Sequence, residues 1–282
     1  MKLGELLREY RLRQNKSQRD FIGSVVTQSY YSKVEKDNSQ ISVKNLVDLL
    51  HYNSISVQEF FSRFDDENNH GREQIKEIEN MIIEAYYANN IEKMRSIKTF
   101  VAGSQLNKSE KDNQILMING FLALIDPHLN SEKLTSAIKN KIFDIPSFTK
   151  DKLVLYCDFM RFYDLEANEI ITQNILREYQ DTSNTAIQEL ILAIVGNILI
   201  FSIENNSFHN ISYFYKSVQS IKAIPKLLFY KMDIEFFKSI IEIKTSNDTS
   251  SLNKCQNIIA VLHAAGMQEY SEELKKFMKK NL

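Results

Sequence analysis

The 282-residue chain has no tryptophan and few helix-breaking residues, with only seven glycines and three prolines. Sheets and tight turns require Gly and Pro, so this scarcity predicts long helices joined by short connections. The two cysteines, Cys157 and Cys255, are far apart in the sequence, which fits a reducing cytosol and gives no disulfide framework. The composition therefore favours an all-α fold without disulfide bonds.

Long apolar segments are also scarce. Met1–Leu7 leads directly into the charged stretch Arg8–Arg13 and does not resemble a signal peptide. The most apolar run, Leu190–Ile203, is interrupted by Gly196 and by polar residues, and it falls short of a membrane span. We interpret this run as a buried helix. We expect a cytoplasmic protein with no membrane partner.

Patterns that carry catalysis or metal binding are missing from the sequence. It contains no Gly-rich phosphate loop, no G-x-S-x-G segment and no H-E-x-x-H segment. The five histidines are isolated, and none lies at metal-ligand spacing from another His or a Cys. The sequence therefore predicts neither a cofactor nor a metal site, and it argues against an enzyme.

Charge is distributed unevenly along the chain, although the formal net charge is only −1. Residues 1–64 carry ten Lys and Arg against seven Asp and Glu, a net charge of +3. The remaining residues carry 25 against 29, a net charge of −4. A basic segment joined to an acidic one suits a small module that binds a polyanion, attached to a body that does not.

Residues 1–64 show the pattern of five short helices around one core. In the first, apolar residues recur at helical spacing: Leu3, Leu6, Leu7 and Tyr10. The second begins at Ser17, which forms a capping box with Asp20 and precedes Phe21 and Ile22. A break at Gly23 and Ser24 ends it.

Three further N-caps mark the other helices of this segment. Thr27 caps a third helix, Gln28–Lys36, with Tyr31 and Val34 turned inward. Asp37 and Asn38 end that helix, because Asp and Asn tolerate a left-handed backbone. Ser42 caps a fourth helix that contains Leu46, Leu49 and Leu50, and Ser56 opens a fifth that contains Phe60 and Phe61.

The second and third predicted helices are separated by only a few residues, which is the spacing of a helix-turn-helix. The segment Lys16–Glu35, KSQRDFIGSVVTQSYYSKVE, resembles the phage-repressor (Cro/CI, XRE) class, and most of all the Rgg/MutR regulators of Gram-positive bacteria. Ile41-Ser42 and the segment from Ile55 to Phe60 continue this resemblance. Two features depart from the phage repressors: the turn is one residue shorter, as in the Rgg group, and Asp37 stands where Gly is usual.

The resemblance implies that the third helix reads double-stranded DNA. Gln28 can pair with adenine, Tyr30 with phosphate or a thymine methyl, and Lys33 with guanine or phosphate. Gln18 stands where such folds clamp a phosphate at a helix start. The predicted DNA-binding residues are Arg8, Arg11, Arg13, Gln18, Gln28, Ser29, Tyr30, Lys33 and Lys36. We assign Glu35 a structural role, pairing with an Arg of the first helix such as Arg11.

The polar segment Asp65–Gly71 lacks apolar periodicity, so we predict a helix-turn-helix domain over 1–64, a linker over 65–71 and a helical domain over 72–282. Pro127, Pro146 and Pro225 fall between predicted helices, and the polar segments 108–113 and 246–251 fill other gaps. The predicted helices of the body cover 75–85, 91–101, 115–125, 134–142, 153–162, 170–179, 187–203, 211–221, 227–241, 252–262 and 274–278.

Neighbouring helix pairs in the body recur every 35–45 residues or so, the period of an α-solenoid. The family resemblance implies degenerate tetratricopeptide-like hairpins whose concave groove binds a short secreted peptide pheromone. Asn119, Arg161 and Asn197 are the predicted peptide-binding residues, because an amide can match a peptide backbone and an Arg can hold a carboxylate. The alternative is that these residues only bond to helix ends or neighbouring carbonyls.

These patterns together predict a homodimeric transcription regulator that binds an inverted-repeat operator and responds to a peptide. The last helix, Leu274–Met278 with Phe277, is a candidate dimer surface, unless it packs on the preceding repeat. Two alternatives stay open: a dimeric repressor without a small ligand, and a protein-interaction scaffold with a vestigial helix-turn-helix.

Overall fold

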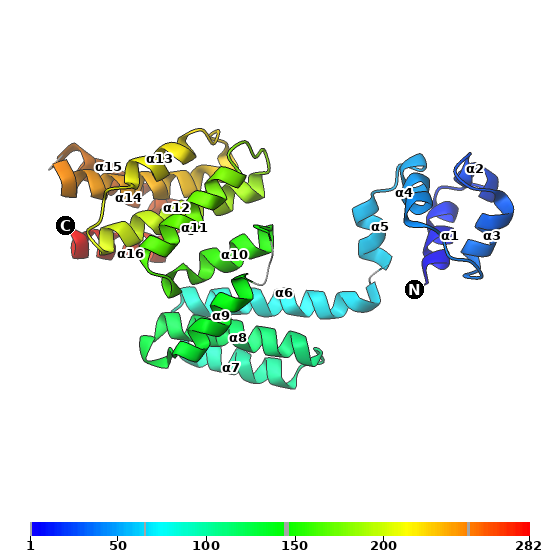
Figure 1. Cartoon of the computed structure of the whole chain (residues 1–282), viewed down its shortest axis with the longest axis horizontal. Helices are drawn as coiled ribbons and strands as arrows, with labels where there is room; N and C mark the ends of the chain where they lie inside the picture. Colours follow the sequence, from blue (N-terminus) through cyan, green and yellow to red (C-terminus); the bar gives the residue numbers. More distant parts are fainter. Residues whose placement is uncertain (1, 65, 144–146, 247–248) are drawn as a thin grey trace. The chain divides into compact units, whose positions relative to one another are not determined.

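The computed structural model describes residues 2–64, 66–143, 147–246 and 249–282, and within these ranges every regular element is a helix (Figure 1). The predicted all-α fold is therefore confirmed. The chain divides into two compact units, Met1–Ile125 and Asp126–Leu282. Each unit is described by itself.

The first unit begins with five short helices: α1 (Leu3–Arg13), α2 (Gln18–Ile22), α3 (Gln28–Glu35), α4 (Val43–Tyr52) and α5 (Val57–Phe64). The predicted caps are confirmed, because Ser17, Thr27, Ser42 and Ser56 each accept a hydrogen bond from the backbone N–H three residues on. We call α1–α5 the head. Its core contains the fully buried residues Leu6, Leu7, Phe21, Tyr31, Leu49, Leu50 and Phe60, whereas Phe61 is exposed.

The end of α3 is built as the sequence predicts. Asp37 has φ +54°, so the chain leaves the helix through a left-handed residue. Its Oδ1 accepts a hydrogen bond of 3.0 Å from the Gly4 amide of α1. A Cβ on Gly4 would lie 2.1 Å from the Val34 carbonyl oxygen, so only glycine permits this close approach of α1 to α3. The Asp37 side chain thus gives this position a tether that a glycine would lack.

Three further helices complete the first unit: α6 (Asp66–Tyr87), α7 (Ile91–Gly103) and α8 (Lys108–Ile125). Residue 65 of the predicted linker lies outside the described residues, and 66–71 are part of α6. The segment 108–113, expected to fill a gap, is instead the first part of α8. The reason is a capping box that the sequence reading missed: Asn107 Oδ1 accepts from the Glu110 amide, and Glu110 Oε2 accepts from the Asn107 amide.

The second unit is an array of helical hairpins. It contains η1 (Pro127–Leu129), α9 (Glu132–Phe143), α10 (Lys150–Phe159), η2 (Met160–Phe162), α11 (Leu165–Glu178), α12 (Thr185–Glu204), α13 (Ile211–Gln219), η3 (Pro225–Leu227), α14 (Leu228–Ser246), α15 (Thr249–Ala264) and α16 (Gln268–Asn281). Pro127 and Pro225 each begin a short 3₁₀ helix, whereas Pro146 lies outside the described residues. Of the predicted gap 246–251, Ser246 ends α14 and Thr249 begins α15.

The helix α12 forms the core of the second unit and packs against α10, α11, α13 and α14. The interpretation of its sequence as a buried helix is confirmed, since Ile191, Val195, Ile198 and Leu199 are almost fully buried. The expectation that the run is too short was wrong, because α12 extends over 20 residues. Among the described residues it is the one helix whose length and mean hydropathy of 2.1 would suffice to cross a membrane. A buried core helix meets the same criterion, and 61% of its apolar window is buried inside the protein.

The last helix uses its apolar side chains inside the unit. Leu274 is buried, and the Phe277 ring lies edge-on to Phe237 of α14, with 5.4 Å between the ring centroids. Lys244 of α14 donates a hydrogen bond to the carbonyl of Asn281. Of the two alternatives for this segment, packing on the preceding helices is therefore observed. The position of a dimer surface stays a prediction.

Candidate functional site

The helix α3 presents a polar face to solvent. Gln28, Ser29 and Lys33 are exposed, whereas Tyr31 and Val34 are buried in the head core. Lys36, the C-cap of α3, is also exposed. The predicted base-reading residues thus lie together on the open side of one helix, with positive charge at two positions.

Tyr30 has a more restricted role than expected. Its side chain is half-buried, and its hydroxyl donates a hydrogen bond of 2.6 Å to the Gln40 carbonyl. This bond ties the start of α3 to the loop before α4. A phosphate contact by Tyr30 would use the remaining acceptor capacity of the hydroxyl or replace this bond, so the contact stays a prediction.

The turn between α2 and α3 depends on Gly23. Its φ is +51°, and a Cβ on this residue would lie 2.5 Å from the Tyr52 ring of α4. Glycine adopts this backbone conformation without strain, and a Cβ would in addition displace the Tyr52 ring. The positive φ thus explains why a glycine stands at this short turn.

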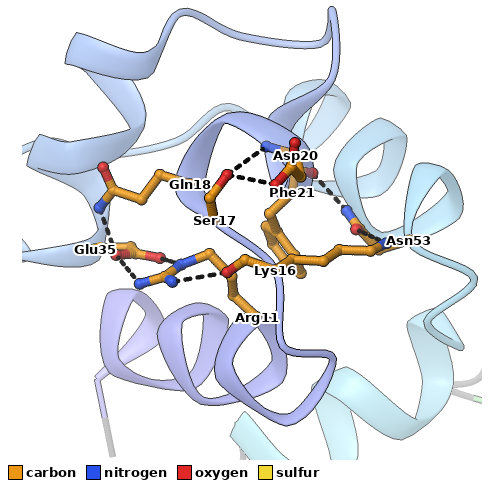
Figure 2. Close-up of polar contacts among 8 residues, drawn as sticks. All are labelled: Arg11, Lys16, Ser17, Gln18, Asp20, Phe21, Glu35 and Asn53. Carbon is orange, nitrogen blue, oxygen red and sulfur yellow. Dashed lines mark hydrogen bonds and ion pairs between the residues drawn. The ribbon is translucent and has the colours of Figure 1, made fainter.

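Glu35 is the centre of a buried polar network that joins the first three helices (Figure 2). Its carboxylate accepts two hydrogen bonds from Arg11, Nε at 2.6 Å and Nη2 at 3.0 Å, and a third from Gln18 Nε2 at 2.7 Å. Arg11 Nη1 also donates to the Lys16 carbonyl at 3.0 Å. The two charged side chains are only 12% and 4% exposed, so the pair is buried and bidentate.

The pKa values of this pair follow from that geometry. Burial acts to raise the pKa of Glu35, but the hydrogen bonds from Arg11 and Gln18 outweigh it and bring the pKa below its ordinary value. The Glu35 hydrogen bond in turn raises the pKa of Arg11, so both groups are charged at neutral pH. The expected pairing of Glu35 with Arg11 is confirmed.

The same placement bears on one predicted DNA contact. Each side-chain nitrogen of Arg11 donates one hydrogen bond inside the head, so Arg11 holds α1, α3 and the loop at Lys16 together. A phosphate contact by Arg11 would use the second hydrogen of Nη1 or Nη2, and it stays a prediction. Gln18 is half-buried and retains a second amide hydrogen, so its phosphate contact stays a prediction.

The remaining predicted cations lie at the surface of α1. Arg8 is exposed, and Arg13 is 63% exposed. Arg13 pairs with Glu9 at 2.6 Å, and Arg63 contacts the same carboxylate at 2.8 Å. Surface ion pairs of this kind contribute little to stability, so Arg13 can exchange its partner for a phosphate at low cost.

Asn53 is a buried residue that sequence reasoning missed. Its side-chain amide donates a hydrogen bond to the Phe21 carbonyl at 2.7 Å, and its Oδ1 accepts from Lys16 Nζ at 2.8 Å (Figure 2). The same amide also donates to the Leu49 carbonyl at 2.8 Å. Its backbone carbonyl accepts from the Gln14 amide. The signal in the sequence was the polar Asn53-Ser54 pair after a Leu-rich helix, which indicates a helix end but not a buried one.

The three predicted peptide-binding residues all have partners within the protein. In the first unit, Asn119 Oδ1 accepts from Lys98 Nζ at 2.8 Å. In the second unit, Asn197 Nδ2 donates to the Cys157 carbonyl at 3.3 Å, and Arg161 forms a bidentate pair with Glu204 at 3.0 and 3.2 Å. The simpler alternative, that these residues bond to neighbouring groups, thus describes their present state.

Arg161 and Asn197 are brought to one junction, where η2 and the end of α10 meet α12. The Arg161 guanidinium lies 5.1 Å from the Phe201 ring centroid, and the two line a pocket of about 230 Å³ with Glu204 and Asn205. Tyr163, a neighbour of Arg161 in the sequence, also lines this pocket. The pair is partly exposed, 48% for Arg161 and 27% for Glu204, so an incoming carboxylate can compete for Arg161.

Comparison with known proteins identifies the family of the chain. A family model described as the C-terminal domain of the HTH-type transcriptional regulator Rgg matches residues 98–276, and a helix-turn-helix model matches residues 7–60. No curated protein sequence matches the chain.

Two solved structures illustrate the similarity of fold. The SHP pheromone receptor Rgg2 of Streptococcus dysgalactiae has a TM-score of 0.73 and 18% sequence identity, with full coverage of both chains. A PrgX/cCF10 complex has a TM-score of 0.64 and 16% identity, and the match covers 99% of this chain and 91% of that one. The Rgg match alone covers more than half of the sequence. The chain belongs to the Rgg family of helix-turn-helix transcriptional regulators.

Proposed function

We propose that the protein binds a specific operator by inserting α3 into the major groove and that a short peptide in the helical body controls this binding. The exposed polar face of α3 carries the proposal. Gln28 and Lys33 have the donor and acceptor groups that base edges recognise, and Ser29 and Lys36 flank them. Arg8, Arg13 and Gln18 supply phosphate contacts around this face.

The operator that suits such a regulator is an inverted repeat bound by two copies of the chain in the cytoplasm. A single α3 contacts only a few base pairs, so a second head on a half-site about 34–36 Å away supplies the missing specificity. A homodimer places two identical heads on two identical half-sites.

The DNA proposal predicts selective loss of affinity when the open face of α3 is changed. Full-length protein is titrated by fluorescence anisotropy into duplexes that tile the region around its own gene. Lys33→Ala and Gln28→Ala should each lower the affinity for the bound duplex by about 5- to 150-fold, the value of one base contact. Lys76→Ala, an exposed change in α6, should leave it unchanged. Affinity should fall steeply as salt rises.

The same titration separates the proposal from the scaffold alternative. If no duplex binds, or if binding is equally strong in the two α3 variants, the helix-turn-helix is vestigial and the protein is a scaffold. The stoichiometry at saturation tests the dimer, which requires two chains per duplex.

Peptide control is supported by the fold and by similar proteins. The described hairpins resemble those of a pheromone receptor and of PrgX in complex with cCF10. Asn197 and Arg161 line one junction, where an amide and a guanidinium can hold a peptide backbone and its carboxylate. Asn119, in the first unit, stays a separate prediction for a peptide contact.

A peptide that acts as a regulator must change the affinity for DNA. Isothermal titration of the full-length protein with synthetic apolar octapeptides should show saturable heat. A bound peptide should change the Kd for the operator, and the bound operator should change the Kd for the peptide by the same factor. Flat titrations with every peptide would favour the ligand-independent repressor. Arg161→Met should weaken binding of peptides with a free carboxylate and leave the matching C-terminal amides unaffected.

A further inference from the structure

Gly196 lies in the middle of α12, where packing gives no reason for a glycine. Glycine is a poor helix former, because it loses more backbone entropy than any other residue. Beyond its own helix, a Cβ on Gly196 would meet one heavy atom within 4 Å, Asp233 Oδ2 at 3.7 Å. That distance is ordinary van der Waals contact, so an alanine would fit. The glycine instead leaves a gap, with room for at least one carbon atom, beside the Asp233 carboxylate.

Asp233, on α14, has an incomplete set of partners. Its Oδ1 accepts a hydrogen bond from the Tyr270 hydroxyl of α16, and the described residues supply no other hydrogen bond or ion pair to this carboxylate. Burial raises the pKa of Asp233 to about 6, although the Tyr270 hydrogen bond acts to lower it. Asp233 is half-buried, and Oδ2, the atom that faces Gly196, has no cation among the described residues to balance its charge.

An aromatic pair lies at the carboxylate, since Tyr270 bonds to Asp233 and packs against Phe229. The Tyr270 ring lies 5.3 Å from the Phe229 ring. Burial raises the pKa of the half-buried Tyr230, and the neighbouring Glu189 and Cys157 raise it further. Aromatic faces attract cations, so these surroundings suit an organic cation better than a metal ion.

We propose that the gap at Gly196, with Asp233 and Tyr270, binds an ammonium or guanidinium group of the ligand peptide. The Asp233 carboxylate supplies the negative charge, Tyr270 holds it in place, and the missing side chain at position 196 gives the cation access. This inference rests on the proposed peptide control. The cation has two possible sources, the free N-terminus of the peptide and a basic side chain.

The probe is a set of synthetic apolar octapeptides, each made with a free or an acetylated N-terminus and with or without one internal lysine. Full-length protein is incubated with the set, separated from free peptide by gel filtration, and the retained peptides are quantified by mass spectrometry. The variants are Asp233→Asn, Gly196→Ala and, as a matched control, Glu178→Gln at an exposed site of α11. Thermal unfolding of each variant is recorded in parallel.

The unmodified protein and Glu178→Gln should retain amine-bearing peptides at least about tenfold over acetylated, lysine-free ones. Asp233→Asn should remove this preference, and Gly196→Ala should weaken it while leaving the Tm unchanged or raised. If Asp233→Asn unfolds, Gly196→Ala carries the test alone. Preference for free N-termini identifies the terminus as the cation, and preference for acetylated lysine peptides identifies the side chain.

Two results would overturn the proposed cation site, and only one of them would also overturn peptide control. Equal retention of acetylated, lysine-free peptides and of their amine-bearing counterparts removes the cation site but leaves peptide control intact. Retention of no peptide in any form removes peptide control itself, and the cation site with it.

Discussion

Glu35→Ala should lower the free energy of unfolding of the head by about 3–5 kcal/mol, the cost of breaking a buried ion pair by removing one partner. The variant leaves the Arg11 guanidinium only slightly exposed and without its bidentate acceptor. It also removes the partner of the Gln18 amide. The loss is therefore much larger than the value of the pair in the intact protein, because an unpaired charge stays buried.

The measurement uses hydrogen exchange of the full-length protein, since a chain with two compact units does not unfold in one step. Amides of α2 and α4 report opening of the head. Asp48→Ala, an exposed change in α4, should leave their exchange unaltered. The double change Arg11→Met with Glu35→Leu should cost less than Glu35→Ala, because it removes both charges together. A loss for Glu35→Ala below about 1 kcal/mol would contradict the buried geometry.

The same pair makes the head sensitive to acid. The pKa of Glu35 in the folded head lies below its ordinary value of 4.5. Its contribution to stability is therefore fully present above the unfolded pKa and is lost as the pH falls through the folded pKa. Protection of the α2 and α4 amides, measured relative to their intrinsic exchange rates at each pH, should fall as the pH drops below about 4.5, and this fall should be absent in the double variant.

The head was predictable from sequence because its signals are local. Ser17, Thr27 and Ser42 cap helices through bonds that span three residues, and Asp37 ends α3 with the left-handed backbone that its residue type tolerates. The sequence also indicated the Glu35–Arg11 pair. It could not show that the pair is buried and bidentate, because that geometry depends on packing between residues that are 24 positions apart.

The body was less predictable from sequence, because several of its contacts join residues that are far apart in the chain. Helix positions follow from apolar spacing, but the segment 108–113 became helical through a capping box that apolar spacing does not show. The partners of Asn197 and Arg161 lie 40 and 43 residues away, so their identity depends on how hairpins pack. Gly196 and Asp233 likewise lie on two helices that are distant in sequence. A single glycine in the middle of a helix does not indicate which residue of another helix lies beside it.

Asn53→Ala should lower the free energy of unfolding of the head by about 2–4 kcal/mol, because a buried carbonyl and a half-buried ammonium lose their partners. The Phe21 carbonyl loses its amide donor, and Lys16 Nζ loses its acceptor. The Leu49 carbonyl is less affected, since the backbone N–H of residue 53 also donates to it.

Two further changes divide the Asn53 effect between its donors and its acceptor. Asn53→Asp keeps the acceptor for Lys16 but turns a carboxylate toward two carbonyl oxygens, so it should destabilise the head at least as much as Asn53→Ala. Lys16→Met removes only the half-buried ammonium and should cost about 1 kcal/mol or less. Asn38→Ala, at an exposed position, is the matched control in the same hydrogen-exchange measurement. A Lys16→Met loss equal to that of Asn53→Ala would place the stabilising bond at Lys16 rather than at the end of α2.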